Sequence, residues 1–215
     1  MEPSHVGRYS NPEIERKTME ILSAAFSGGI EIPIDIDRLV YQHGSIDDIV
    51  PAELLEDEFN VAAVLINKPN GHFDILVDQD TLDSHYARAN FSIAHEFGHV
   101  VLHSQLCVNC RTVQDAVALN ARIKTSYDFI ERNANYFAGA ILMPFRTLGE
   151  DTAKVYEALV RTFGHDLNLI YDKLCSTLAL RYGVSFQPMA IRLKELGLRR
   201  KIEDAMRYRV PYLDP

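Results

Sequence analysis

The sequence predicts an α+β fold in which a small antiparallel sheet is followed by a series of helices. The first observation is the Asn70-Gly71 pair between two β-rich segments, because both residues tolerate the positive φ of a tight hairpin turn. The second is that apolar residues recur with helical spacing after residue 90. The third is the composition of the 215 residues, 47% hydrophobic and 24% charged, which is typical of a globular protein.

Two helices and one hairpin are predicted before residue 90. An amphipathic helix over 12–27 is stopped by a pair of glycines, and a short helix over 35–42 ends near Gly44. The antiparallel hairpin consists of strands over 59–67 and 73–78.

The rest of the chain is predicted to be helical. The longest predicted helix, 123–142, ends at Met143-Pro144, because proline cannot continue it. Residues 105–122 are interpreted as a loop with a short helix. Residues 1–150 are expected to form a core, on which a helical region over 151–215 packs. The predicted helices are 91–104, 123–142, 153–163, 166–181 and 186–197.

Charge and composition narrow the function classes. The net charge of −8 divides into 6 Lys/Arg against 18 Asp/Glu in residues 1–105 (−12) and 16 against 12 in residues 106–215 (+4). This balance argues against non-specific nucleic-acid binding by the whole chain, while the acidic half can meet a basic partner. The chain has no apolar run long enough for a membrane helix, no signal-peptide features and only 3 cysteines. We therefore expect a cytoplasmic protein without a membrane partner.

An H-E-x-x-H motif carries the chemistry, with His95 and His99 at its ends and Glu96 after the first histidine. Two histidines four residues apart lie on one helix face, so they can hold the same metal ion. Glu96 is the candidate general base for a water bound to that ion. The apolar residues of this helix, such as Ile93 and Val100, form an arc of roughly 120° nearly opposite the histidines. This separation favours a metal site over buried structural histidines.

A catalytic zinc site has three protein ligands and a water, so one more ligand is needed. Glu131 lies at the edge of the apolar stripe of the predicted helix 123–142, where an unpaired carboxylate would be costly to bury. Asp128, on a similar face, is the alternative ligand, and Asn135 lies four residues after Glu131 at the same edge. This helix can approach the motif helix closely because it carries small residues, namely Ala134, Ala138, Gly139 and Ala140.

Several other groups have open roles. His103 follows His99 by four residues and either steadies Glu96 or a reaction intermediate, or ends the helix as a half-buried polar residue. Cys107 and Cys110 form a C-x-x-C, but a structural zinc site needs four ligands, so ordinary thiols are favoured over a second metal site or a redox switch. The candidate oxyanion partners are Tyr127, Tyr136, His165 and Tyr182.

Residues 176–194 have the pattern of a helix-turn-helix. The second helix offers Gln187, Arg192 and Lys194, which is a small set for reading bases. Packing on the core or docking of a substrate is therefore the favoured interpretation, and weak direct DNA binding is the alternative.

Three segments together resemble one known family. They are Ala94-His95-Glu96-Phe97-Gly98-His99 with Leu102-His103, then Glu131-x-x-Ala134-Asn135-x-Phe137-Ala138, then Ile141-Leu142-Met143-Pro144. This combination resembles the ImmA/IrrE family of metallo-endopeptidases over roughly residues 30–200. The run 88–92 also fits, although Asn90 stands where the family often has arginine.

The resemblance implies a minimal zincin-like fold with an active-site helix pair and a gluzincin-type site. It implies that His95, His99 and Glu131 hold zinc, with manganese as the alternative metal, that Glu96 is the general base, and that Asn135 orients a ligand histidine. Family members typically cleave an Xre-type helix-turn-helix repressor, so the predicted function is a zinc-dependent endopeptidase that derepresses genes. The alternative function is a non-proteolytic regulator that binds DNA or a repressor and holds a structural or sensory metal.

Overall fold

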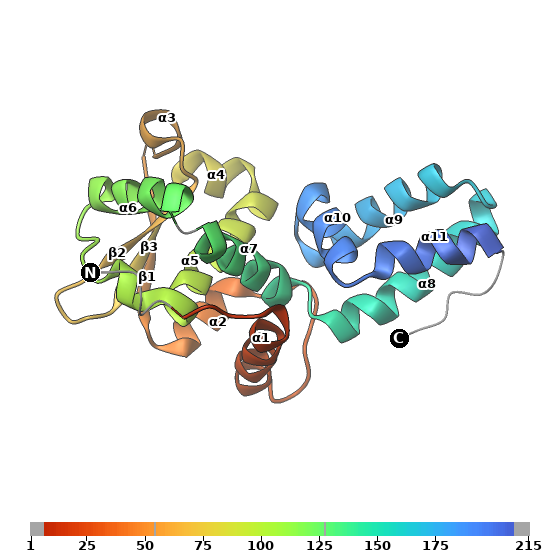
Figure 1. Ribbon diagram of the computed structural model, residues 1–215, viewed down its shortest axis with the longest axis horizontal. Helices are drawn as coiled ribbons and strands as arrows, with labels where there is room; N and C mark the ends of the chain where they lie inside the picture. Colours follow the sequence, from red (N-terminus) through yellow and green to blue (C-terminus); the bar gives the residue numbers. More distant parts are fainter. Residues whose placement is uncertain (1–6, 54, 127, 209–215) are drawn as a thin grey trace. The chain divides into compact units, whose positions relative to one another are not determined.

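The computed structural model describes residues 7–53, 55–126 and 128–208 (Figure 1). The chain forms two compact units, Met1–Ile141 and Leu142–Pro215. The sequence placed the boundary after residue 150, inside a helix of the second unit. Each unit is described separately below.

The first unit begins with two capped helices, α1 (Asn11–Ala25) and α2 (Ile36–His43). The backbone N–H of Ser10 donates to Glu13 at 2.8 Å, and Asp35 accepts from the backbone N–H of Arg38 at 3.0 Å. These side chains satisfy groups that the first turn of a helix leaves open. Gly44 ends α2 with a left-handed φ of 75°. Both helices were predicted from the sequence and are confirmed.

The sheet has three strands in the order β1-β3-β2: β1 (Ile46–Ala52), β2 (Ala63–Asn67) and β3 (Phe73–Asp78). The predicted hairpin is confirmed, because β2 pairs antiparallel with β3, and Gly71 takes a φ of 86° in the turn. The expectation of a purely antiparallel sheet is corrected, because β1 runs parallel to β3 and makes the sheet mixed. The sequence did not predict β1, because this strand contains Asp47, Asp48 and Pro51, which are residue types rare in strands. The predicted α+β class is confirmed.

The helices α3 (Leu55–Phe59) and α4 (Gln79–Ser84) connect the strands to α5 (Tyr86–Cys107). α5 packs against β2 and β3, and its apolar residues Ile93 and Phe97 are buried. The sequence predicted only its centre, 91–104. α5, which carries the H-E-x-x-H motif, is therefore supported by the sheet.

Two helices replace the predicted loop over 105–122 and the predicted helix over 123–142. They are α6 (Val113–Ser126) and α7 (Asp128–Leu142), so residues 123–126 belong to α6. α7 crosses α5 closely at Gly98, where an added Cβ would lie 3.0 Å from Phe137 Cδ1 and 3.3 Å from Ala134 Cα. The expected small-residue contact between the two helices is confirmed at this crossing.

The second unit consists, in its described part, of α8 (Phe145–Phe163), α9 (Leu167–Tyr182), α10 (Phe186–Glu195) and α11 (Leu198–Tyr208). α9 and α10 form the predicted helix-turn-helix, with Gly183 left-handed at a φ of 62° between them. α8 is longer than predicted, and α11 was missed because charged residues dominate its first turn. Along the described residues, no helix combines the length and the apolar character that crossing a membrane requires.

Candidate metal centre

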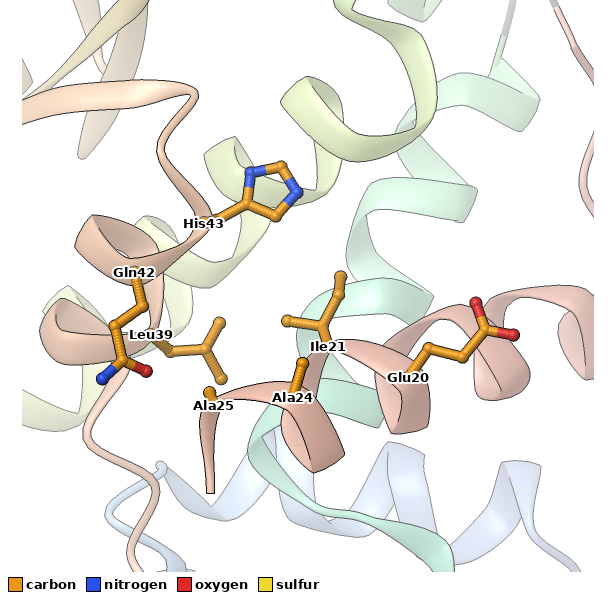
Figure 2. A pocket seen from close by; sticks show the side chains of 7 residues that line it. All are labelled: Glu20, Ile21, Ala24, Ala25, Leu39, Gln42 and His43. Atoms are coloured by element: carbon orange, nitrogen blue, oxygen red, sulfur yellow. The ribbon is translucent and has the colours of Figure 1, made fainter. Parts of the chain in front are cut away.

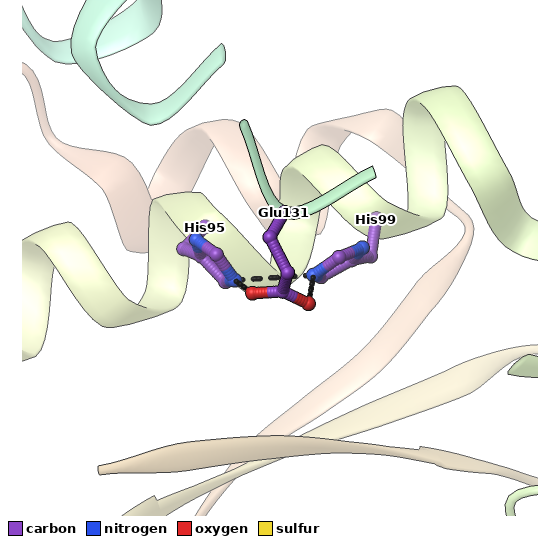
Figure 3. A group of neighbouring side chains, drawn as sticks. All are labelled: His95, His99 and Glu131. Carbon is purple, nitrogen blue, oxygen red and sulfur yellow. Dashed lines mark hydrogen bonds and ion pairs between the residues drawn. The ribbon is translucent and has the colours of Figure 1, made fainter. Parts of the chain in front are cut away.

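His95 and His99 lie one turn apart on α5 and face Glu131 of α7 (Figure 3). The helical repeat of 3.6 residues places both imidazoles on the same side of α5. The side chains are mostly removed from solvent, with relative exposures of 17% for His95, 5% for His99 and 19% for Glu131. Asp128 does not join this group: its side chain is 75% exposed and lies 3.5 Å from Arg132.

The donor atoms of these three residues converge on one point. The two Nε2 atoms are 3.1 Å apart, and each lies 3.5 Å from a different oxygen of Glu131. Ligand atoms about 2.0–2.1 Å from a tetrahedral zinc ion would be about 3.3 Å from one another. The spacing and the set of two imidazoles and one carboxylate therefore fit a divalent metal ion. Within the described ranges, no other group of three metal-ligand side chains comes together in this way.

Asn135 fixes the orientation of the His95 ring. Its Oδ1 lies 3.1 Å from Nδ1 of His95. An amide oxygen only accepts hydrogen bonds, so Nδ1 of His95 donates, and Nε2 is the ring nitrogen directed at Glu131 and His99. The resemblance left open which histidine Asn135 orients, and the geometry points to His95.

Burial and neighbouring charges set the pKa values of the two histidines in opposite directions. Burial acts to lower the pKa of His95, but the hydrogen bond that its ring donates to Glu131 and the charges of Glu96 and Glu131 raise the pKa overall. Burial and the nearby His95 lower the pKa of His99 to about 3. A neutral His99 keeps a lone pair available for a metal.

Glu96 is buried beside the cluster, with a relative exposure of 7%. Burial, and to a smaller extent the charge of Glu131, raises the pKa of Glu96 to about 7, against the opposing effect of His95. It stands outside the three converging ligands. A carboxyl group in this environment can hold and release a proton near neutral pH.

His103 is completely buried at a break in α5, where its φ of −141° and ψ of 25° are not helical. Among the described residues, neither ring nitrogen has a hydrogen-bond partner. Burial lowers the pKa of His103 to about 4, so the ring is neutral at pH 7. Its expected role in steadying Glu96 or an intermediate stays a prediction.

The oxyanion candidates are largely engaged elsewhere. The hydroxyl of Tyr136 donates to Glu15 at 2.8 Å, and that of Tyr182 donates to the buried Asp151 at 3.0 Å. His165 lies exposed between α8 and α9. Tyr127 lies outside the described residues.

The thiols of Cys107, Cys110 and Cys175 are free and buried. Burial strongly raises the pKa of Cys107 and, with the charge of Asp115, raises that of Cys110 to about 11. A thiol with a raised pKa forms little of the reactive thiolate. This agrees with the interpretation of the C-x-x-C as ordinary thiols.

Arg192 does not lie on a readable surface of α10. It is 1% exposed, and its Nε donates to the backbone oxygen of Met143 at 3.2 Å. The exposed part of α10 includes Phe186 at 44% and Ile191 at 50%. The removal of Arg192 from the expected base-reading set weakens the DNA-binding interpretation.

A separate groove of about 610 Å³ lies between α1 and α2 (Figure 2). His43 on its wall packs edge-on against Phe97 of the motif helix, with ring centroids 5.0 Å apart. None of the predicted site residues lines it, so we do not assign the metal chemistry to this groove. The lining residues are Glu20, Ile21, Ala24, Ala25, Leu39, Gln42 and His43.

The comparison with known families fits this geometry. A family model for the M78 peptidases, described as the IrrE N-terminal-like domain, matches residues 82–194, which is more than half of the chain. The chain belongs to this family. The M78 match begins just before α5 and includes every candidate site residue. Membership supports metallopeptidase activity and confirms the resemblance drawn from the motifs. No curated protein matches the chain.

Proposed function

We propose that this M78 peptidase is a zinc-dependent endopeptidase of the gluzincin type, with manganese as the alternative metal. The observation that carries the proposal is the convergence of His95, His99 and Glu131, with Glu96 buried beside them. His95, His99 and Glu131 would hold the ion, and Asn135 would keep His95 in the ligating tautomer.

Glu96 supplies the proton chemistry in this proposal. A bound zinc ion lowers the pKa of water to about 7 and polarises the carbonyl of a peptide. Glu96 accepts the proton of the attacking water and then delivers it to the amine of the leaving peptide. The position of Glu96, directly after one ligand and outside the converging set, suits this transfer.

The proposed substrate is an Xre-type helix-turn-helix repressor in the cytoplasm, and its cleavage would derepress genes. Two features support this choice. Repressors of this class carry basic DNA-binding surfaces, while residues 1–105 of this chain have a net charge of −12 (6 basic against 18 acidic residues). The sheet has two edge strands, β1 and β2, and an extended peptide can bind to such an edge by adding a strand.

The second candidate function is a non-proteolytic regulator that binds DNA or a repressor around a structural metal. A regulator of this kind needs no buried carboxylate beside three ligands. The burial of Arg192 leaves α10 with fewer groups for base contacts, which disfavours direct DNA binding.

Glu96→Gln separates the two functions, since it keeps the size of the side chain and removes the base. Metal-loaded protein is incubated with a purified Xre-type repressor, and cleavage is followed by mass spectrometry. We expect Glu96→Gln to retain metal and repressor binding while cleavage falls roughly 10²–10⁴-fold. The exposed Glu58→Gln is the matched control and should cleave like the parent. Relief of repression by Glu96→Gln with the repressor intact would replace the protease with the regulator.

A further inference from the structure

The segment of Arg8 and Tyr9, which precedes α1, is held by the side chain of Asn133 on α7. With the Asn133 amide oriented so that both of its ends are paired, Oδ1 accepts from the backbone N–H of Tyr9 at 3.2 Å. The amide nitrogen donates to the backbone oxygens of Tyr9 and Phe129, both at 3.3 Å. Asn133 is 8% exposed, so these bonds are shielded from water. One side chain thus pairs with both backbone groups of one residue, as a neighbouring strand would.

The side chains of the same segment pack on the same two helices. The Tyr9 ring lies on His103 of α5, with centroids 5.6 Å apart, and the guanidinium of Arg8 lies 4.7 Å from the centre of the Phe129 ring. Phe129 in turn meets the edge of His103 at 6.4 Å. The segment is therefore bound to α5 and α7 by backbone pairing, ring packing and a cation–π contact.

These ring contacts surround the buried His103. Burial of an imidazole without a hydrogen-bond partner costs free energy, which the packing of aromatic rings around His103 offsets. The rings of Tyr9 and Phe129 provide this packing at the break in α5. The segment thus helps to close the junction between the end of α5 and the start of α7.

The contact residues on α7 alternate with the residue that faces the cluster. Phe129 and Asn133 flank Glu131 by two positions on either side, which is about 200° around a helix. One turn further on, Tyr136 donates to Glu15 of α1 at 2.8 Å. α7 therefore presents Glu131 to the histidines on one face and is held by the N-terminal residues on the opposite face.

We propose that Tyr9 and Asn133 are positioning residues that clamp α7 against α5 and so place Glu131 opposite His95 and His99. The clamp is Arg8 and Tyr9 together with Phe129, Asn133 and His103. The inference rests on the proposed function in so far as Glu131 is taken as a metal ligand. No sequence motif marked Tyr9 or Asn133; the only signal was a polar residue on an otherwise apolar face of the predicted helix.

The first experiment measures the clamp without metal. Amide hydrogen exchange is compared in metal-free parent, Tyr9→Ala and Asn133→Asp proteins. Asn133→Asp keeps the shape of the side chain and loses the N–H that bonds Tyr9 and Phe129. We expect exchange in α7 to become about tenfold faster in both variants, while β2 and β3 exchange as in the parent. Parental exchange in α7 in both variants would overturn the clamp.

The second experiment measures the consequence for the site. Co²⁺ affinity by chelator competition and the visible absorption spectrum of bound Co²⁺ report on ligand geometry. We expect Tyr9→Ala and Asn133→Asp to bind Co²⁺ about tenfold more weakly with an altered spectrum. Tyr9→Phe keeps the ring and should restore the parental values. Tyr41→Ala, which removes an aromatic ring elsewhere in the same unit, is the control.

The outcomes distinguish this inference from the proposed function. Faster exchange in α7 with weaker, altered Co²⁺ binding supports the clamp. Parental Co²⁺ affinity and spectrum in both variants would refute the positioning of Glu131, even if Glu96 proves essential for cleavage. If the parent takes up no Co²⁺ but the variants exchange faster in α7, the clamp stands and the metalloprotease function fails.

Discussion

The side-chain oxygen of Asn135 lies 3.1 Å from Nδ1 of His95, across the junction of α7 and α5. This contact leaves Nε2 of His95 as the ring nitrogen directed at the cluster. One helix therefore supplies both a candidate ligand, Glu131, and the group that orients a ligand on the other helix.

Asn135→Ala should lower zinc affinity roughly 10–100-fold, the usual range when a partner of a ligand histidine is lost. The ligand atoms remain, but the His95 ring can then turn or change tautomer. Titration against a chromogenic chelator measures the affinity. Asn168→Ala in the second unit serves as the control. Unchanged zinc affinity in Asn135→Ala would show that the bond to His95 does not matter for the metal.

Gly98→Ala should destabilise the first unit and weaken metal binding. An added Cβ would lie 3.0 Å and 3.2 Å from atoms of Phe137 and 3.3 Å from the backbone of Ala134, which cannot easily move aside. Overpacking of this kind costs about 1–3 kcal/mol. Thermal unfolding followed by circular dichroism measures the loss. Gly28→Ala is the matched control, since nothing lies within 4 Å of its Cβ. Equal melting temperatures for the two variants would contradict the close helix crossing.

The metal-free protein should lose stability in mild acid partly because of His103. The pKa of His103 is lowered to about 4 by burial, from 6.5. Between these values the unfolded chain binds a proton that the folded chain does not, so stability falls as the pH decreases from about 6.5 to about 4. His103→Phe removes this proton-binding group, while Glu96 and His95 titrate in both proteins. Urea unfolding at pH 7 and pH 5 should show a loss about 1–2 kcal/mol smaller in His103→Phe. An identical loss in both proteins would mean that His103 is accessible to protons.

The cysteines should be unreactive in the folded protein. Cys107, Cys110 and Cys175 are all buried, and the raised pKa values of the first two keep their thiols protonated. We expect Ellman's reagent to label none of them within minutes at pH 8 and all 3 in denaturant. Cys107→Ala with Cys110→Ala should leave the metal content unchanged. Loss of about one metal equivalent in that variant would reveal a second site.

The parts of the site that depend on local spacing could be predicted from the sequence. Two histidines four residues apart share a helix face whatever surrounds them, and Glu131 could be selected because it interrupts an apolar edge. Asp128 could not be excluded by periodicity, since its exposure depends on where α7 begins.

Features set by tertiary pairing could not be predicted. β1 is held by its parallel pairing with β3, which outweighs the poor strand propensity of Asp47, Asp48 and Pro51. Arginine is a residue type usually found at the protein surface, and only the tertiary structure places Arg192 against the backbone of Met143. The two bonds between Asn133 and Tyr9 likewise join positions more than a hundred residues apart.

The hydrogen bond between Glu15 and Tyr136 spans 121 residues and has a consequence for synthesis on the ribosome. At roughly 5–20 residues per second, Glu15 is translated about 6–24 seconds before its partner Tyr136 on α7. The same delay separates Tyr9 from Asn133. His95 and His99 are translated before Glu131, the acidic residue opposite them. The three side chains of the cluster therefore cannot converge until most of the first unit has been translated.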